Sequence, residues 1–251
     1  MLSVAAAIGT IAFDRALKRA RVTADAVWMV AITLAAGFVG AKLWYVFVDA
    51  PAKFGAIGWG ETWNSTGFSW YGALISGIAA LALQGRQAKI GVLSTLYLAA
   101  PAVAFGHGIG RIGCFLSGDG CYGIAIRPVH FFSLTFRPWG MGFPNGLQPV
   151  FVPVYPTPLY ELTVDLFIGW WLWRLLGKPH ATGAIAGQYL ALAGMARFLV
   201  EFIRRNPRVL WGLSVAQFVS AGAVVAGVVL MWCGPHRPLS CVGRHPLGKP
   251  A

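Results

Sequence analysis

The sequence predicts an all-α polytopic membrane protein with about seven transmembrane helices, a short first helix and a small periplasmic cap. Three observations predict this fold class. Apolar residues make up 57% of the 251 residues and charged residues only 11%, a balance that is typical of multi-pass membrane proteins. Seven apolar stretches follow one another along the chain. A long stretch rich in glycine, proline and aromatic residues separates the fourth of them from the fifth.

The apolar stretches differ in how well they suit a spanning helix, which needs about 20 mostly apolar residues. In chain order they are Leu2–Phe13, Ala26–Val48, Phe68–Leu83, Ile90–Gly106, Leu159–Leu176, Ala184–Ile203 and Leu213–Trp232. The second, sixth and seventh are long enough to cross a bilayer, whereas the third and fourth are short and rich in glycine. The first is too short, and we interpret it as a truncated or wrongly started helix. A signal peptide fits less well, because its basic residues precede the apolar run and here they follow it.

The remaining segments complete the expected organisation. Residues 116–158 contain turn-forming dipeptides such as those of Phe143-Pro-Asn-Gly. A loop of this length is functional or disordered, and its aromatic content favours a folded cap on the outer surface. We therefore expect one transmembrane domain over residues 1–232, including the cap, followed by a disordered cytoplasmic tail over residues 233–251, which is rich in proline and glycine.

The net charge of +12 could indicate a nucleic-acid partner, but its distribution indicates a membrane orientation. With the amino terminus outside and the carboxyl terminus inside, more than half of the 20 cationic residues would lie in short cytoplasmic loops, as the positive-inside rule expects. We therefore predict no nucleic-acid partner. Arg204, Arg205 and Arg208 fall on the outer side instead. Either the local topology differs there or these arginines meet lipid phosphate.

Two of the four cysteines, Cys114 and Cys121, are expected at the outer face, where an oxidising compartment permits a disulfide. Cys233 and Cys241 fall at the start of the tail and within it. Two cysteines without matching histidines are poor evidence for zinc. The sequence therefore predicts neither a metal nor another cofactor.

Ionisable residues inside the apolar stretches are the main functional signal, because a charged side chain in lipid costs at least about 2.5 kcal/mol and usually marks a site. Residues 106–115 read Gly-His-Gly-Ile-Gly-Arg-Ile-Gly-Cys-Phe. Their G-x-G-x-x-G pattern is not a dinucleotide site, since that motif needs a preceding strand and a following helix. Gly106 and Gly110 instead predict a face on which a second helix approaches closely.

His107 and Arg111 are four residues apart and share one helix face. His107 could also be a core histidine with satisfied hydrogen bonds, and Arg111 could extend towards the interface. The glycines around Arg111 favour a phosphate clamp, since a guanidinium group binds phosphate in a bidentate manner.

Acidic residues begin the fifth apolar stretch. Tyr160 and Glu161 come first, and Asp165 lies one helical turn deeper on the same face. Glu161 could alternatively stabilise the positive amino-terminal end of the helix. That interpretation accounts for Glu161 better than for Asp165.

Arg197, Glu201 and Arg204 follow one stripe of the sixth apolar stretch. They could form an internal ion pair, and this is compatible with a second role. An acid held between two arginines would orient them towards an anionic lipid headgroup. Together these residues predict an intramembrane site for an anion.

Two further residues are weaker candidates. Asp119, in the sequence Ser117-Gly-Asp-Gly-Cys121, could be another acid near this face, although Asp-Gly is also a common turn. Tyr71 follows Phe68-Ser-Trp in the third stretch, and an aromatic residue there could simply belong to the interfacial belt.

The order of these motifs resembles the prolipoprotein diacylglyceryl transferase family over about residues 10–232. Each motif is short, but their shared order is specific. The matching pieces are Gly40-Ala-Lys-Leu-Trp-Tyr45, Ser69-Trp-Tyr-Gly-Ala-Leu-Ile75, Gly110-Arg-Ile-Gly-Cys-Phe115, Gly120-Cys-Tyr-Gly123, Tyr155-Pro-Thr-Pro-Leu-Tyr-Glu161, Arg197-Phe-Leu-Val-Glu-Phe-Ile-Arg204 and the pattern Ser214, Gln217, Ser220.

The resemblance implies a multi-pass enzyme of the bacterial inner membrane that moves diacylglycerol from phosphatidylglycerol to the thiol of a lipobox cysteine in a secreted precursor. The implied partners are phosphatidylglycerol, the prolipoprotein signal peptide with its lipobox, and membrane lipids. Arg111 would bind the headgroup, and Arg197 and Glu201 would form the essential pair of a late helix. We place Glu161, Tyr160, Arg204 and Asp119 with Arg111 as substrate-binding residues.

The sequence departs from the family pattern at Tyr71 and Tyr155, where many members have histidine, and at Cys114, where many have asparagine. These departures leave open a catalytically altered or inactive relative that binds anionic lipid. A small-solute permease is less well supported, since no inverted repeat is visible. If the chain is active, we expect His107 to act as the base, with Tyr71 or Glu201 as alternatives.

Overall fold

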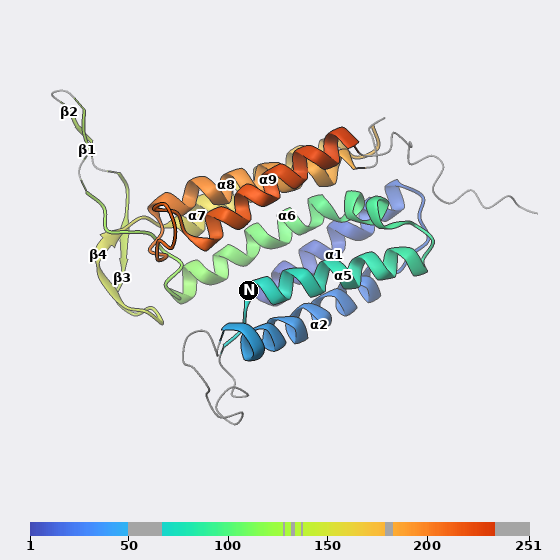
Figure 1. Ribbon diagram of the computed structural model, residues 1–251, viewed down its shortest axis with the longest axis horizontal. Coiled ribbons are helices and arrows are strands. Elements are labelled where there is room, and N and C mark those ends of the chain that lie inside the picture. Colours follow the sequence, from blue (N-terminus) through green and yellow to red (C-terminus); the bar gives the residue numbers. More distant parts are fainter. Residues whose placement is uncertain (50–66, 128, 132–133, 137, 179–182, 234–251) are drawn as a thin grey trace, which may run out of the picture. The chain divides into compact units, whose positions relative to one another are not determined.

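The computed structural model describes residues 1–49, 67–127, 129–131, 134–136, 138–178 and 183–233. Within these residues the chain forms seven α-helices (Figure 1). They are α1 Leu2–Arg19, α2 Ala26–Trp44, α5 Trp70–Gln87, α6 Val92–Ser117, α7 Thr157–Leu175, α8 Ala184–Val200 and α9 Val215–Cys233, with a π-helix η1 Tyr45–Asp49 and a 3₁₀ helix η2 Glu201–Ile203. The predicted all-α membrane fold is confirmed.

Three helical segments in the described part of the chain are long and apolar enough to cross a membrane: Ala26–Asp49, Val92–Ser117 and Val215–Trp232. Large apolar side chains on these helices, such as Val225 and Val229 of α9, are exposed at the protein surface. This is expected of a surface that meets lipid rather than water.

Two helices are longer than the apolar stretches that predicted them. α1 continues beyond Phe13 through a basic segment to Arg19. α6 does not end at Gly106 but continues for 26 residues to Ser117, with Pro101 inside it. The glycines of α6 do not break the helix, and α1 and α7 pack against two of them, Gly106 and Gly108. The sequence motif of residues 106–115 is therefore helical throughout, so His107 and Arg111 do share one face of a helix.

The chain divides into two compact units. The described residues of the second fall within residues 17–96, and their core is the pair α2 and α5. These helices approach closely where glycines meet, since a Cβ atom on Gly72 would lie only 2.2 Å from the Gly40 carbonyl oxygen. Asp25 caps the amino terminus of α2 by accepting hydrogen bonds from the backbone of Val27 and Trp28.

The described residues of the first unit fall within residues 1–16 and 97–233, and they include most of α1 and α6 together with α7, α8 and α9. Gly106 of α6 faces the Ala5 carbonyl of α1, as the small-residue face predicted. A Cβ atom on Gly110 would meet no described atom within 4 Å, so this glycine is not needed for close packing. Gly108 is the tightly packed one, because a Cβ atom there would lie 3.0 Å from the Cβ atom of Asp165 on α7.

The predicted cap segment is folded and contains short strands. β1 Val129–Phe131 pairs antiparallel with β2 Leu134–Phe136, and β3 Met141–Phe143 pairs antiparallel with β4 Val150–Val154. A small core of Tyr122, Phe143 and Val154 holds the β3–β4 pair, with the rings of Tyr122 and Phe143 stacked at 5.2 Å. The Gly123 backbone bridges to Arg204, which joins the cap to the segment after α8. The single-domain assignment and the disordered tail stay predictions, and residues 234–251 lie outside the described residues.

Helices α8 and α9 lie side by side in the first unit (Figure 1) and depend on a glycine contact. A Cβ atom on Gly187 would lie 2.6 Å from the Gly227 carbonyl oxygen. We expect Gly187→Ala to lower the free energy of unfolding by about 1–3 kcal/mol, because the backbones must separate. Gly222→Ala on α9 is the matched control, since its Cβ atom meets no described atom within 4 Å. Equal melting midpoints of the two variants in detergent would contradict this packing.

Candidate functional site

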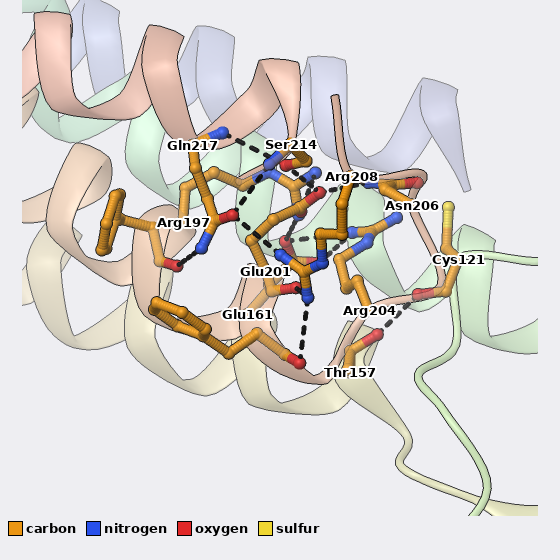
Figure 2. A network of polar contacts seen from close by, with 12 residues as sticks. Cys121, Thr157, Glu161, Arg197, Glu201, Arg204, Asn206, Arg208, Ser214 and Gln217 are labelled. Carbon is orange, nitrogen blue, oxygen red and sulfur yellow. Dashed lines mark hydrogen bonds and ion pairs between the residues drawn. The ribbon is translucent and has the colours of Figure 1, made fainter. Parts of the chain in front are cut away.

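Glu161 is the centre of the candidate site. Its carboxylate is 6% exposed and contacts three arginines from three segments, a group that we call the arginine cluster. Figure 2 shows Glu161 with two of them, Arg197 and Arg204. Arg111 of α6 places Nε 3.2 Å from Oε2, and Arg197 of α8 places Nη1 3.0 Å from Oε1. Arg204, just after η2, places Nη1 3.2 Å from Oε2. Residues separated by about 90 positions thus meet at one carboxylate.

The start of α7 positions Glu161. The helix begins at Thr157 with Pro158 in its first turn, where proline loses no hydrogen bond. The Thr157 hydroxyl donates to the Cys121 carbonyl oxygen, which fixes the helix start against the cap. Glu161 consequently lies beyond the first turn of α7, which contains no acidic residue. Its carboxylate binds arginines rather than stabilising the helix end, the alternative that the sequence left open.

Glu201 is a second acid of the site and is fully buried, with 0% exposure. Arg197 Nη2 lies 2.8 Å from its Oε2, so Arg197 bridges Glu161 and Glu201. The Asn206 amide and the Ser214 hydroxyl donate to Oε1 at 2.6 and 2.7 Å. The free-energy cost of removing this carboxylate from water is therefore offset by an ion pair and two hydrogen bonds.

The structure differs from the predicted stripe of Arg197, Glu201 and Arg204. α8 ends at Val200, and Arg204 follows the 3₁₀ turn in an extended conformation. Its guanidinium therefore reaches Glu161 on α7 instead of Glu201. The acid shared by several arginines is Glu161, because the turn redirects the chain before Arg204.

A second polar layer holds the segment after η2. Arg208 Nη1 donates to Gln217 Oε1 at 2.8 Å and Nη2 donates to the Glu201 carbonyl at 3.2 Å. Gln217 Oε1 also accepts from the Ser214 backbone at 3.0 Å. Sequence reasoning missed Asn206 and Arg208 as site residues. The arginines on the unexpected side of the membrane were the available signal for Arg208.

The charges of the site favour an added anion. Among the described residues, the three guanidinium groups of the arginine cluster form ion pairs with two carboxylates, those of Glu161 and Glu201. Arg197 keeps 27% exposure. The Nε atom of Arg111 is buried and makes no hydrogen bond within the described structure, although it lies at ion-pair distance from Glu161. The cluster thus retains positive charge and an unused donor.

His107 and Asp165 form a separate pair in the same unit. His107 Nδ1 of α6 lies 2.7 Å from Asp165 Oδ2 of α7. The histidine is 36% exposed and the carboxylate is buried. Because a carboxylate oxygen accepts, this contact places a proton on Nδ1, so that Nε2 is the acceptor in the neutral imidazole. Gly108 permits the contact by letting α6 approach Asp165 closely. Asp165 was noted for its position one turn after Glu161, but it was not predicted as a site residue.

The remaining predicted residues lie around this site or elsewhere. Asp119 accepts a hydrogen bond from the Cys121 backbone at 3.0 Å in the turn after α6. Tyr160 neighbours Glu161 on α7 and is half-buried. Tyr71 lies near the start of α5, in the second unit. Its role as an alternative base stays a prediction.

Comparison with known proteins identifies the family. The family described as prolipoprotein diacylglyceryl transferase matches residues 1–233. The chain belongs to this family. A diacylglyceryl transferase fold thus carries the arginine cluster and the His107–Asp165 pair, and the resemblance seen in the sequence motifs is confirmed.

Relatives within the prolipoprotein diacylglyceryl transferase family share about a third of their residues with this chain. A protein of Leptospira interrogans is 32% identical over 216 residues, which cover 77% of this chain and 66% of the relative. One of Clostridium tetani is 30% identical over 237 residues, covering 91% and 88%. One of Methylibium petroleiphilum is 34% identical over 206 residues, covering 78% and 73%. Each is named phosphatidylglycerol–prolipoprotein diacylglyceryl transferase.

Proposed function

We propose that this chain transfers the diacylglyceryl group of phosphatidylglycerol to the lipobox cysteine thiol of secreted prolipoproteins. It acts in the bacterial inner membrane, with its amino terminus outside and its carboxyl terminus inside. Family membership and the names of the relatives support this proposal. The observation that carries it is the arginine cluster, in which three guanidinium groups share one carboxylate.

The arginine cluster binds the phosphodiester of the lipid. Guanidinium groups donate parallel hydrogen bonds to phosphate oxygens, and the Nε atom of Arg111, at ion-pair distance from Glu161, makes no hydrogen bond within the described structure. Arg197 is the most exposed of the three and so the most accessible to a headgroup. Glu161 holds the three cations together while no lipid is bound. Tyr160 and Asp119 lie at the periphery as further substrate-binding residues.

The reaction replaces a carbon–oxygen bond by a carbon–sulfur bond. The substrate thiolate attacks the glycerol carbon that carries the phosphate, and the electron pair of the broken bond moves to the phosphate oxygen. Glycerol phosphate then leaves with increased negative charge. Arg111 and Arg197 stabilise this charge as it develops. The nucleophile belongs to the substrate protein, so no cysteine of this chain takes part in the transfer.

His107 accepts the proton of the substrate thiol. A free thiol has a pKa near about 8.5, so a base increases the thiolate fraction at neutral pH. Asp165 fixes the imidazole orientation through the 2.7 Å contact with Nδ1 and so directs the basic character to Nε2. This role makes Asp165 a positioning residue.

A transfer assay tests the function directly. The purified chain is reconstituted in vesicles with phosphatidylglycerol and a lipobox peptide, and the peptide mass is followed. We expect a thioether-linked diacylglyceryl group on the cysteine and release of glycerol phosphate. Vesicles of phosphatidylethanolamine alone, and a peptide with serine in place of cysteine, are the controls. Lipid binding without transfer, together with failure to complement a transferase-depleted strain, would contradict the proposal.

We expect His107→Gln to lower the transfer rate at pH 7 by about 10²- to 10⁴-fold, because the general base is lost. The defect should shrink as the pH rises past about 8.5, where the substrate thiol ionises without help. Asp165→Asn should show a smaller defect with the same pH trend. Rates are measured between pH 6 and 9.5. A defect independent of pH would show a structural role, and an undiminished rate would move the base to Tyr71 or Glu201.

A further inference from the structure

Two cysteines lie at the edge of the arginine cluster without a part in the transfer reaction. Cys114 is on the last turn of α6 and Cys121 follows it by seven residues; both are free thiols and partly buried. Their sulfur atoms and an Asp119 carboxylate oxygen lie within 4.8 Å of one another. The two thiols therefore influence each other's titration, and Cys114 lowers the pKa of Cys121.

The turn between the cysteines brings them together. Gly118 and Gly120 both adopt positive φ, 56° and 86°, a conformation that glycine reaches without strain. The Asp119 carboxylate accepts from the Cys121 backbone and closes the turn. The chain after α6 therefore folds back so that Cys121 faces the helix it has just left.

Both sulfur atoms interact with the arginine cluster. Arg111 acts electrostatically on Cys114, which lies about one helical turn further along α6. Arg204 acts electrostatically on Cys121, and Figure 2 shows the two residues at the same edge of the polar network. A change in the charge of these sulfur atoms is therefore felt by two members of the cluster.

We propose that Cys114 and Cys121 form a reversible disulfide, and that this bond controls anion binding at the arginine cluster. The second part rests on the proposed function. The reduced pair carries a negative thiolate that competes with the lipid phosphate for the guanidinium groups. The disulfide is neutral, so its formation leaves Arg111 and Arg204 available to the anion.

The surroundings of Cys121 favour the attacking thiolate. The hydrogen bond from Cys114, helped by the nearby Arg204, lowers the pKa of Cys121 to about 7, while burial and Asp119 act in the opposite direction. A substantial thiolate fraction is thus present at neutral pH. Arg111 and Arg204 are positively charged, so they disfavour a metal cation at the cysteine pair and stabilise a thiolate there.

The oxidation is balanced by a disulfide-bearing oxidant, such as glutathione disulfide. The Cys121 thiolate attacks one sulfur of the oxidant and releases the first thiol. Cys114 then loses its proton to solvent and attacks the Cys121 sulfur, which releases the second thiol. Two protein thiols are oxidised, and one oxidant disulfide is reduced to two thiols.

The test uses the full chain with Cys233→Ser and Cys241→Ser, so that only the pair remains of the four cysteines. After treatment with glutathione disulfide, we expect an intact mass lower by two hydrogen atoms and a fall from two maleimide labels to none. Dithiothreitol should restore both labels. A lasting glutathione adduct, two free thiols, or labelling blocked by a bound metal until chelation would each overturn the disulfide.

The effect of the disulfide on the transfer rate is measured separately, with phosphatidylglycerol vesicles and a lipobox peptide. We expect transfer by the oxidised protein to be at least about fivefold faster than by the reduced protein at low lipid content. The Cys114→Ser, Cys121→Ser variant should show equal rates under both conditions. Equal transfer rates of the oxidised and reduced protein would overturn the proposal that the disulfide controls anion binding. A disulfide without transfer in either state would refute the proposed function but not the disulfide.

Discussion

Arg111→Ala should lower diacylglyceryl transfer by about 10²- to 10³-fold, the loss typical of removing one donor from a developing negative charge. The fold should survive, because Glu161 keeps its contacts with Arg197 at 3.0 Å and with Arg204 at 3.2 Å. Transfer rates in phosphatidylglycerol vesicles give the effect, and the melting midpoint in detergent shows that the protein is folded. Arg111→Lys should recover little, since an ammonium group lacks the bidentate geometry.

Arg205→Ala is the matched control for this experiment. Arg205 is exposed and its guanidinium lies over the Tyr122 ring at 5.6 Å, outside the arginine cluster. The variant loses the same charge from the same unit. We expect a rate within a few-fold of the unaltered chain. If both variants lose activity equally, the overall positive charge matters and Arg111 is not a specific clamp.

Glu161→Gln should produce the largest loss of stability, about 3–5 kcal/mol, because three guanidinium groups lose their shared carboxylate. The amide keeps the shape of the side chain but not its charge, so repulsion within the cluster remains uncompensated. We expect the melting midpoint in detergent to fall and transfer to be lost. Sulfate or phosphate should raise the midpoint of this variant more than that of the unaltered chain, by occupying the place of the carboxylate.

Chloride at the same ionic strength is the control, since it screens charges without bridging several arginines. Purification that succeeds only with sulfate present would itself demonstrate the anion site. A variant with an unchanged midpoint and no response to sulfate would mean that water already solvates the three arginines. The phosphate clamp would then lose its physical basis.

The sequence was sufficient to find most of the charged residues of the site, but not Asp165 or Arg208. A charge in an apolar stretch is costly, so Arg111, Glu161, Arg197 and Glu201 were each visible as exceptions. Which of them meet was not visible, because that depends on how the helices are rotated and where they end. α8 ends before Arg204, and the 3₁₀ turn that follows places the Arg204 guanidinium beside Glu161 rather than beside Glu201.

Two other features escaped prediction for physical reasons. The fourth apolar stretch was expected to end at Gly106, because the glycines and charged residues that follow lower the mean hydropathy. α6 nevertheless stays helical to Ser117, and it packs against α1 and α7. The partner of His107 was also hidden. Asp165 lies 58 residues away, and only the close approach at Gly108 brings the two together.

Because α6 is unbroken, it fixes the spacing of three residues to which we assign different functions. His107, Arg111 and Cys114 occupy successive turns of one face of a single helix, so proton acceptor and anion ligand are separated by about 6 Å along its axis. Inserting one residue between them would rotate one group by about 100° away from the other. The segment between His107 and Arg111 should therefore tolerate no change in length.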